Sequence, residues 1–157
     1  MVRGKESIMC GRFMNSEGRE ISPSDLAEVQ TIQSTMDKIW GINSSYGGKL
    51  IINARSETVK ELPTFRYMKP CIIPARGYFE WDKNKTKYLF TRRDDAIILL
   101  AGVYYDDRFV IITKDAEPQL AVIHHRMPVM LTTDHSLDWL KSKNLHDIES
   151  NCIYNIA

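Results

Sequence analysis

The sequence predicts an α+β fold, with an antiparallel, barrel-like β core and a few peripheral helices. Segments rich in β-branched and aromatic residues dominate the chain from Cys71 onward, which is typical of strands. The helix-like segments lie toward the margins and do not alternate with strands, as they would in a parallel βαβ fold. No internal repeat or linker divides the chain, so residues 10–157 are expected to form one domain.

The first half of the chain contains one expected helix and short strands. Ser22-Pro23-Ser24-Asp25 has the serine, proline and acidic residue of a helix start. Apolar residues recur at helical spacing from Leu26 to Met36, which predicts a helix over 23–36. Short strands are expected at 39–42 and 50–53, with a loop at 43–49 between them. Residues 56–67 predict at most a short helix that ends near Pro63.

The second half consists mainly of strands separated by polar turns. Asp115–Leu120 is expected to form one helical turn, and Thr133-Asp134 to begin a last helix with Leu137 and Leu140 on its apolar side. The expected strands are 71–81, 88–91, 97–105, 109–113 and 121–131.

Composition excludes several classes of protein. The longest apolar run has ten residues, too short to cross a bilayer, and no secretory signal begins the chain. The net charge of +1 provides no general attraction to nucleic acid, so any such contact requires a local cluster. The three cysteines form no CxxC pair, and the four histidines lack metal-site spacing. We therefore expect a cytoplasmic protein without membrane contact, metal or cofactor.

Four segments place reactive side chains where a strand would favour apolar ones. In extended segments, residues i and i+2 share a face, which would pair Cys10 with Arg12, Asn53 with Arg55, and His124 with Arg126. A thiol, an amide and an imidazole beside guanidinium groups suit an anionic substrate such as phosphate. Each residue alone has an ordinary structural explanation, such as a buried cysteine or a core histidine. The segments are Cys10-Gly11-Arg12-Phe13, Asn53-Ala54-Arg55, Gly77-Tyr78-Phe79-Glu80-Trp81 and His124-His125-Arg126-Met127-Pro128.

Together with three further motifs, in the same order, these segments resemble the SOS-response-associated peptidase (SRAP) family of abasic-site processing proteins. The resemblance extends from Met9 to about Leu140. The added motifs are Trp40-Gly41, Pro74-Ala75-Arg76 before Gly77, and Ala101-Gly102-Val103.

The resemblance implies a role in DNA repair, in which an N-terminal cysteine attaches covalently to an abasic site in single-stranded DNA. It implies that Cys10 is the nucleophile, and that residues 1–9 are a leader or an alternative-start extension absent from the mature protein. The implied supporting catalytic residues are Asn53, Glu80 and His124. The implied DNA-binding residues are Arg12, Trp40, Arg55 and Arg126, with Trp40 stacking on a base.

An N-terminal cysteine suits this chemistry. A terminal amine has a pKa near ~7.7, against ~10.4 for lysine, so about a third of it is neutral at pH 7.4. The neutral amine can form an imine with the sugar aldehyde, and the thiol of the same residue can close a thiazolidine ring. Glu80 lies between Phe79 and Trp81, where desolvation would keep it protonated for acid–base work. Trp81 itself is expected to face the core.

Three functions remain open at this point. The leading hypothesis is a protein, expected to be monomeric, that crosslinks to abasic sites and can act as a lyase through the imine. The second is an autoprocessing cysteine peptidase that uses Cys10, His124 and either Asn53 or Glu80. The third is a non-catalytic binder of single-stranded DNA.

Overall fold

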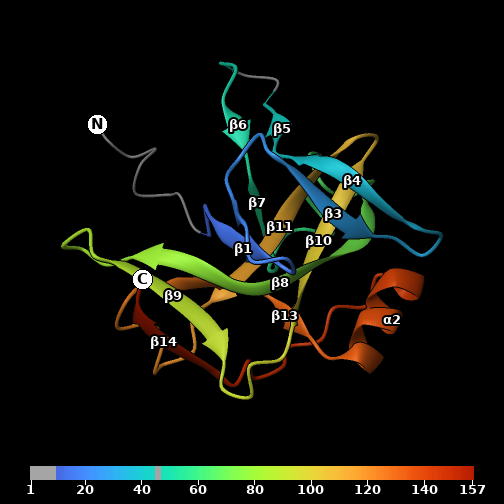
Figure 1. Ribbon diagram of the computed structural model, residues 1–157. Helices are drawn as coiled ribbons and strands as arrows, with labels where there is room; N and C mark the ends of the chain where they lie inside the picture. Colours follow the sequence, from blue (N-terminus) through green and yellow to red (C-terminus); the bar gives the residue numbers. More distant parts are fainter. Residues whose placement is uncertain (1–9, 45–46) are drawn as a thin grey trace.

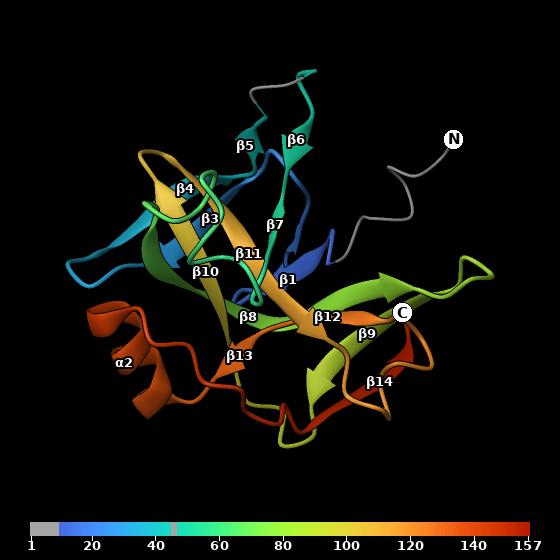
Figure 2. The ribbon, with the colours of Figure 1, turned by 180° about the vertical axis from the view of Figure 1, so that it is seen from behind.

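A computed structural model of the chain describes residues 10–44 and 47–157, so the expected leader at 1–9 lies outside the described residues. The described chain is mostly β-sheet with a single helix (Figures 1 and 2). The elements in chain order are β1 (Phe13–Asn15), β2 (Glu20–Ile21), β3 (Leu26–Gln30), β4 (Thr35–Trp40), β5 (Ile42–Asn43), β6 (Leu50–Ile51), β7 (Asn53–Arg55), β8 (Lys69–Trp81), β9 (Lys87–Arg92), β10 (Ile98–Tyr105), β11 (Arg108–Asp115), β12 (Arg126–Pro128), β13 (Met130–Leu131), α2 (Thr133–Ser142) and β14 (Cys152–Ile156).

Five strands close into a barrel. Strand β8 pairs with β10, β10 with β11, β11 with β4, β4 with β3, and β3 again with β8. The barrel-like core is therefore confirmed, but the prediction of an antiparallel core is wrong, because β11 runs parallel to both β4 and β7. These partners are distant in sequence, and local patterns do not reveal their relative direction. Helices are few, as expected, and the described residues contain one, α2, at the periphery of the barrel.

Strand β8 connects the barrel to the strands outside it. Its first part pairs with β10, and its last part lies between β1 and β9, which in turn pairs with β14 (Figure 2). Close approach of β9 requires Gly77, since a Cβ there would lie 2.5 Å from the carbonyl oxygen of Phe90. The end of β8, Glu80-Trp81, is thereby held at the edge of the barrel.

The helix predicted over 23–36 is wrong, because this segment forms the β3–β4 hairpin. The apolar residues that gave the helical spacing are largely outside the core, since Leu26 is 56% and Ile32 52% exposed. Val29, which also fitted the helical spacing, is buried together with Ala27, in the period of two that a strand requires. The helix-start motif forms a turn, in which the backbone N–H of Ser22 donates to Asp25 Oδ2 at 2.8 Å. Local capping chemistry serves turns as well as helices.

The other expected elements agree with the structure to different degrees. The four strands predicted between residues 71 and 113 are confirmed within a few residues, and so is the last helix, whose N-cap is Thr132. Residues 56–67 form turns, and the expected strand 121–131 is reduced to β12 and β13 because residues 120–123 continue a turn. Strand β14 was not predicted. No helix among the described residues is long and apolar enough to cross a membrane.

Trp40 belongs to the core. Its side chain is fully buried, its ring packs 5.2 Å from Phe13 and 6.4 Å from Phe109 between centroids, and its Nε1 donates to the carbonyl oxygen of Ile52 at 3.0 Å. A ring enclosed on both faces cannot stack on a base. The prediction that Trp40 binds DNA is therefore wrong for this structure.

We expect Trp40→Ala to lower the free energy of unfolding by about 3–5 kcal/mol, because it leaves a cavity and removes one of the hydrogen bonds that the Ile52 carbonyl accepts. Urea unfolding followed by circular dichroism measures this. Trp81→Ala is the matched control, since that ring is only half-buried. A loss below about 1 kcal/mol for Trp40→Ala would contradict the core assignment.

Candidate active site

A cavity of about 410 Å³ lies at the end of β8, on the side of the barrel where β1 begins. The end of β8, the segment before β1 and the segment before β12 all contribute to its lining. Three of the four motifs singled out in the sequence thus meet around one space of a size that binds small ligands. Its lining residues are Gly11, Arg12, Pro23, Ile52, Glu80, Trp81 and His124.

Cys10 lies beside this cavity, fully buried, and is held against β8 by its backbone. Its N–H donates to Glu80 Oε2 at 2.6 Å, and the carbonyl of Arg12 accepts from the N–H of Phe79 at 2.9 Å. The backbone of Cys10 has φ +48°, in the left-handed region that residues other than glycine rarely adopt. Such a conformation persists only where surrounding contacts enforce it, and it is more frequent at functional sites.

Glu80 is a carboxyl group that keeps its proton at neutral pH. It is buried at the end of β8, and this burial raises its pKa from 4.5 to about 8. Hydrogen bonds from the backbone N–H groups of Cys10 and Trp81 act in the opposite direction and only partly offset the burial. A carboxyl group with its pKa near the working pH can both donate and accept protons.

His124 faces Glu80 from the segment before β12. Its Nε2 lies 3.8 Å from Glu80 Oε1, and its Nδ1 accepts a hydrogen bond from the backbone N–H of Arg126 at 3.2 Å. Desolvation, and secondarily His125, lowers its pKa, so the ring is neutral at pH 7. Nδ1 also lies 3.4 Å from the carbonyl oxygen of Arg126, but the contact with the N–H is the shorter one, so the proton of the neutral ring is assigned to Nε2, the atom that faces Glu80.

The thiol of Cys10 does not form a thiolate–imidazole pair. Burial raises its pKa well above the ordinary value, and the negative charge of an ionised Glu80 would raise it further. Within residues 10–44 and 47–157, neither His124 nor any other side chain forms a hydrogen bond with its Sγ. In this structure the thiol is therefore neutral and is not activated by an imidazole of the described residues.

Asn53 contacts a different strand from the other three candidate catalytic residues. It begins β7, its Nδ2 donates to the carbonyl oxygen of Ile111 at 3.4 Å, and its neighbour Ile52 lines the cavity in its place. In the described part of the chain no hydrogen bond joins it to Cys10, Glu80 or His124. Close contacts thus link Cys10, Glu80 and His124, and the catalytic role of Asn53 stays a prediction.

The candidate arginines occupy different environments. Arg12 lies at the cavity rim, where its Nη1 donates to Glu20 Oε2 at 2.8 Å. Arg55 is exposed, 3.8 Å from Glu57. Both can therefore reach an anion that approaches the protein surface.

Arg126 cannot reach an anion at the protein surface, and its assignment as a DNA-binding residue is wrong for this structure. It is 1% exposed, and its guanidinium contacts Glu57, Asp115 and Thr113. The expectation that His124 and Arg126 share a face fails because His124 lies outside the strand, which begins at Arg126. Arg126 instead positions His124 through its backbone N–H.

Three residues near the cavity were not predicted to belong to the site. Trp81, expected in the core, is half-buried at the rim, with the guanidinium of Arg12 5.5 Å and the ammonium of Lys87 5.6 Å from its ring centroid. Glu20 accepts hydrogen bonds from both cations. Strand alternation does place Trp81 on the face opposite Glu80, but at the end of β8 that face is not covered by the barrel. Nothing in the sequence singled out Glu20 or Lys87.

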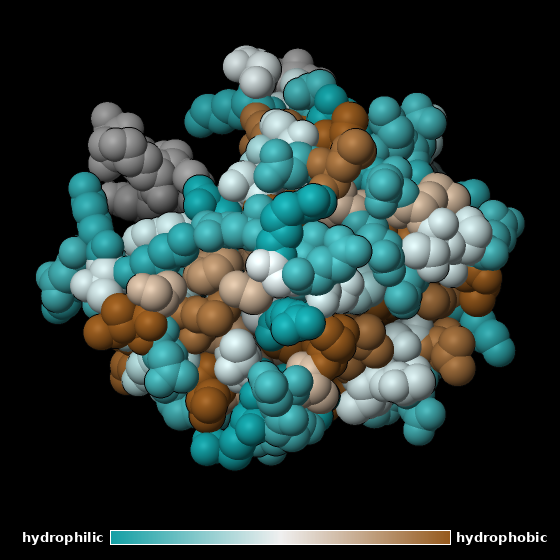
Figure 3. Space-filling view, in the orientation of Figure 1, coloured by the Kyte–Doolittle hydropathy of each residue, from teal (hydrophilic) through white to brown (hydrophobic). Residues whose placement is uncertain are grey.

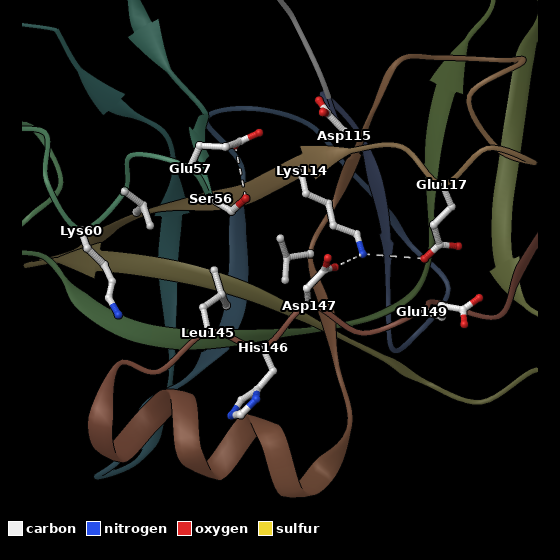
Figure 4. Close-up of a pocket in the computed structure, with 12 residues that line it drawn as sticks. Ser56, Glu57, Lys60, Lys114, Asp115, Glu117, Leu145, His146, Asp147 and Glu149 are labelled. Atoms are coloured by element: carbon white, nitrogen blue, oxygen red, sulfur yellow. Dashed lines mark hydrogen bonds and ion pairs between the residues drawn. The ribbon is translucent and has the colours of Figure 1, made fainter.

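A larger cavity, of about 630 Å³, lies beside β11 and the segment after α2 (Figure 4). Its wall is mainly acidic, and Lys114 is already held by Asp147 at 2.8 Å and Glu117 at 3.7 Å. Such a wall repels phosphate, so this cavity does not suit an anionic substrate. Its charged lining residues are Glu57, Lys60, Lys114, Asp115, Glu117, Asp147 and Glu149.

Comparison with known proteins identifies the family and the architecture of the chain. The family model described as SOS response associated peptidase (SRAP) matches residues 24–155. The chain is 36% identical over 121 residues to the abasic site processing protein YoaM of Bacillus subtilis, covering 67% of this chain and 53% of YoaM. It is 26% identical over 182 residues to the abasic site processing protein YedK of Escherichia coli, covering 86% and 81%. The chain thus spans about half the length of the Bacillus relatives it matches.

Solved structures support the fold. A protein from Bacteroides thetaiotaomicron superposes with a TM-score of 0.76 at 24% identity, over 91% of this chain and 79% of the other. A phage-related protein from Bordetella bronchiseptica superposes with a TM-score of 0.72 at 19% identity, over 94% of both chains. At these identities the likeness concerns the architecture alone.

The raised pKa of Glu80 predicts how stability depends on pH. The folded chain binds its proton up to about pH 8, whereas an unfolded carboxyl releases it near 4.5. The folded state therefore binds more protons between these values, and the free energy of unfolding falls as pH rises through this window, by about 2 to 5 kcal/mol. We expect Glu80→Gln to remove most of this fall.

Urea unfolding at pH 5 and pH 8.5 measures this effect, with Glu149→Gln, an exposed residue at the acidic cavity (Figure 4), as control. An equal fall in the wild type and in Glu80→Gln would show that Glu80 is not the group responsible.

Proposed function

Because the chain belongs to the SOS response associated peptidase family, we propose that it processes abasic sites in DNA and that Cys10 reacts with the lesion. Relatives that share 36% and 26% of aligned residues with it carry the name abasic site processing protein. The observation that carries the proposal is the 2.6 Å contact between the backbone nitrogen of Cys10 and the buried carboxyl group of Glu80. This contact places the atom that would become the reactive amine beside an acid–base group.

The proposal requires that residues 1–9 are absent from the active protein. While a residue precedes Cys10, its nitrogen is an amide with no lone pair available for attack on an aldehyde. Once the α-amine is free, its pKa near ~7.7 leaves a substantial neutral fraction at physiological pH. Translation from Met9 followed by methionine removal, or cleavage before Cys10, would produce this terminus.

The reaction follows from the two nucleophiles of one residue. The neutral amine attacks the aldehyde carbon of the ring-opened deoxyribose, the carbonyl oxygen takes up a proton, and loss of one water molecule gives an imine. The thiol then adds to the imine carbon, its proton passes to the nitrogen, and a five-membered thiazolidine ring closes. A neutral thiol suffices for ring closure because it is held on the same residue as the imine.

Glu80 and His124 supply the proton transfers. Glu80 lies against the attacking nitrogen, and with a pKa of about 8 it is present in both forms near neutral pH. Its ionised form can accept the proton of the nitrogen, and its protonated form can donate one to the hydroxyl that leaves as water. His124, with its Nε2 proton directed toward Glu80, can donate a hydrogen bond to the opened sugar. Asn53 begins β7 and would have an indirect role, in which it holds the neighbouring Ile52 in the cavity wall.

The DNA strand would be bound at the cavity rim. Arg12, at this rim, is placed to neutralise a phosphate, and the exposed Arg55 would take a phosphate farther along the strand. The half-buried Trp81 offers the aromatic surface that the buried Trp40 cannot provide. Single-stranded DNA fits this rim better than a duplex, because an unpaired base is free to stack. An imine that does not close to the thiazolidine also permits elimination of the 3′ phosphate, so lyase activity would compete with the stable crosslink.

We expect the chain that begins at Cys10 to form a DNA adduct that survives denaturation when incubated with single-stranded DNA containing an abasic site. Cys10→Ala should abolish this adduct while it retains salt-sensitive binding, because the arginines remain. Denaturing gel electrophoresis and intact-mass spectrometry measure the product. The control is the same chain with an added residue before Cys10, which blocks the amine.

Other outcomes of this experiment would identify a different function. Loss of residues 1–9 from the full chain, dependent on Cys10 and without any DNA adduct, would indicate an autoprocessing peptidase. Binding without an adduct in every form would indicate a non-catalytic binder. Either result would reject the proposed crosslinking.

Glu80→Gln should slow adduct formation by about 10²–10⁴-fold, the usual contribution of general acid–base catalysis, and flatten its pH dependence. Binding to undamaged single-stranded DNA should stay within about a factor of two of the wild type, because protonated Glu80 and glutamine are both uncharged. Quenched time courses between pH 5.5 and 9 measure the rate. A rate and pH profile equal to those of the wild type would remove Glu80 from the mechanism.

A further inference from the structure

Two cations at the rim of the cavity converge on a single oxygen atom. The Nη1 of Arg12 and the Nζ of Lys87 lie 2.8 Å and 2.7 Å from the same atom, Oε2 of Glu20. Arg12 comes from the segment before β1, Glu20 from β2, and Lys87 from the first position of β9. This is the arrangement of an anion site whose anion is a carboxylate of the chain itself.

The two cations are held in place by more than Glu20. Both lie over the ring of Trp81, Arg12 at 5.5 Å and Lys87 at 5.6 Å from its centroid, and Lys87 also lies 4.4 Å from that of Phe79. These cation–π contacts come from β8, a strand anchored in the barrel. The cations would therefore stay close together after Glu20 moved away.

Glu20 is the part of this cluster that is easiest to move. It lies in the two-residue strand β2, which pairs with β1 alone among the described strands. The side chains of Glu20, Arg12 and Lys87 are 37%, 34% and 31% exposed, so water screens their ion pairs. The Nε of Arg12 is buried and has no partner among the described residues, so this guanidinium retains an unused donor.

The cluster adjoins the proposed reaction centre. Arg12 and Trp81 line the cavity that holds Glu80 and His124, so an anion on Arg12 and Lys87 would be a near neighbour of the reacting sugar. In a DNA strand, the anionic group next to a sugar is a phosphate of that same strand, so a phosphate would be the anion that Arg12 and Lys87 bind.

Beyond Lys87, the β8–β9 turn extends the positive charge outward. Lys83 and Lys85 are exposed and form no ion pair within the described residues. The carboxylate of Asp82 is turned inward and accepts the backbone N–H groups of Asn84 and Thr86 at 2.9 Å and 3.0 Å. The turn projects from the left of the molecule in Figure 1, where Figure 3 shows hydrophilic side chains.

We propose that Arg12 and Lys87 form a binding site for one phosphate group next to the abasic sugar, and that Glu20 occupies this site in the free protein and is displaced by DNA. The proposal rests on the proposed function and deepens it. It adds Lys87 as a phosphate-binding residue and gives Glu20 the role of an internal competitor. The β8–β9 turn gives the strand its direction as it leaves the cavity.

The test is a double-mutant cycle in DNA binding. Affinities of the wild type, Glu20→Gln, Lys87→Gln and the double variant for a labelled, undamaged single-stranded oligonucleotide are measured by fluorescence anisotropy across a salt series. Lys60→Gln is the matched control, an exposed lysine at the acidic cavity (Figure 4). Thermal unfolding of each variant shows that it is folded.

We expect Glu20→Gln to tighten binding about two- to fivefold at low salt, because two ion pairs no longer compete with the phosphate. Lys87→Gln should weaken binding and reduce the steepness of the salt dependence by about 0.7, the contribution of one phosphate contact to a single strand. In the Lys87→Gln background, Glu20→Gln should increase the DNA affinity less than it does in the wild type, because the Lys87 ammonium that Glu20 would release is missing. Lys60→Gln should change neither quantity.

Failure of this inference is distinguishable from failure of the proposed function. If the wild type crosslinks to abasic DNA but Glu20→Gln binds no more tightly and Lys87→Gln keeps the full salt dependence, the phosphate site is wrong and the function stands. If Glu20→Gln increases the DNA affinity as much in the Lys87→Gln background as in the wild type, Arg12 and Lys87 do not share one phosphate site. If the wild type neither binds nor crosslinks, both proposals are overturned.

Discussion

The site depends on one hydrogen bond between distant parts of the chain, from the backbone nitrogen of Cys10 to the carboxyl group of Glu80. The bond forms because β1 pairs with the last part of β8, which places the segment before β1 against Glu80. Burial then keeps that carboxyl protonated at neutral pH, and Glu80 lies 3.8 Å from His124. The position of Cys10, the protonation of Glu80 and the proximity of His124 therefore depend on the same strand end.

Charge is distributed locally, which explains how a chain with a net charge of +1 can suit a polyanion. The larger cavity carries a surplus of carboxylates, and buried Arg126 is engaged by Glu57 and Asp115. Arg12, Lys87 and the lysines of the β8–β9 turn lie at the smaller cavity instead. Under the proposed function, the separation of the two surfaces would direct the DNA strand to the smaller cavity.

Sequence patterns were sufficient where local chemistry determines the outcome. The long strands from 71 to 113 and the helix at 133–142 were predicted because their periodicity or capping is unambiguous. The 23–36 hairpin was missed because its turn uses the residues of a helix cap, and its exposed Leu26 and Ile32 mimic helical spacing. Parallel pairing of β11 with β4 and β7 is a long-range property that no local pattern contains.

The site was predicted in part for the same reason. Motif recognition identified Cys10, Glu80 and His124, which the structure brings together, but strand alternation misplaced Arg126 because His124 precedes β12. Trp40 was expected to bind DNA and is a core residue, whereas Trp81 was expected in the core and lines the cavity. The contacts of Glu20 and Lys87 could not be predicted, because β2 and β9 are distant in sequence and only the fold brings Lys87 within 2.7 Å of Glu20 Oε2.

The short contact at Cys10 has a consequence for how the protein would become active. In the described chain a neutral peptide group faces a neutral carboxylic acid, and the pair carries no charge. Release of the terminus would place an ammonium at the same point, and its positive charge would draw the proton off Glu80. Release of the chain end would thus change the protonation state of Glu80, from a neutral acid to a carboxylate that can accept the proton of the amine.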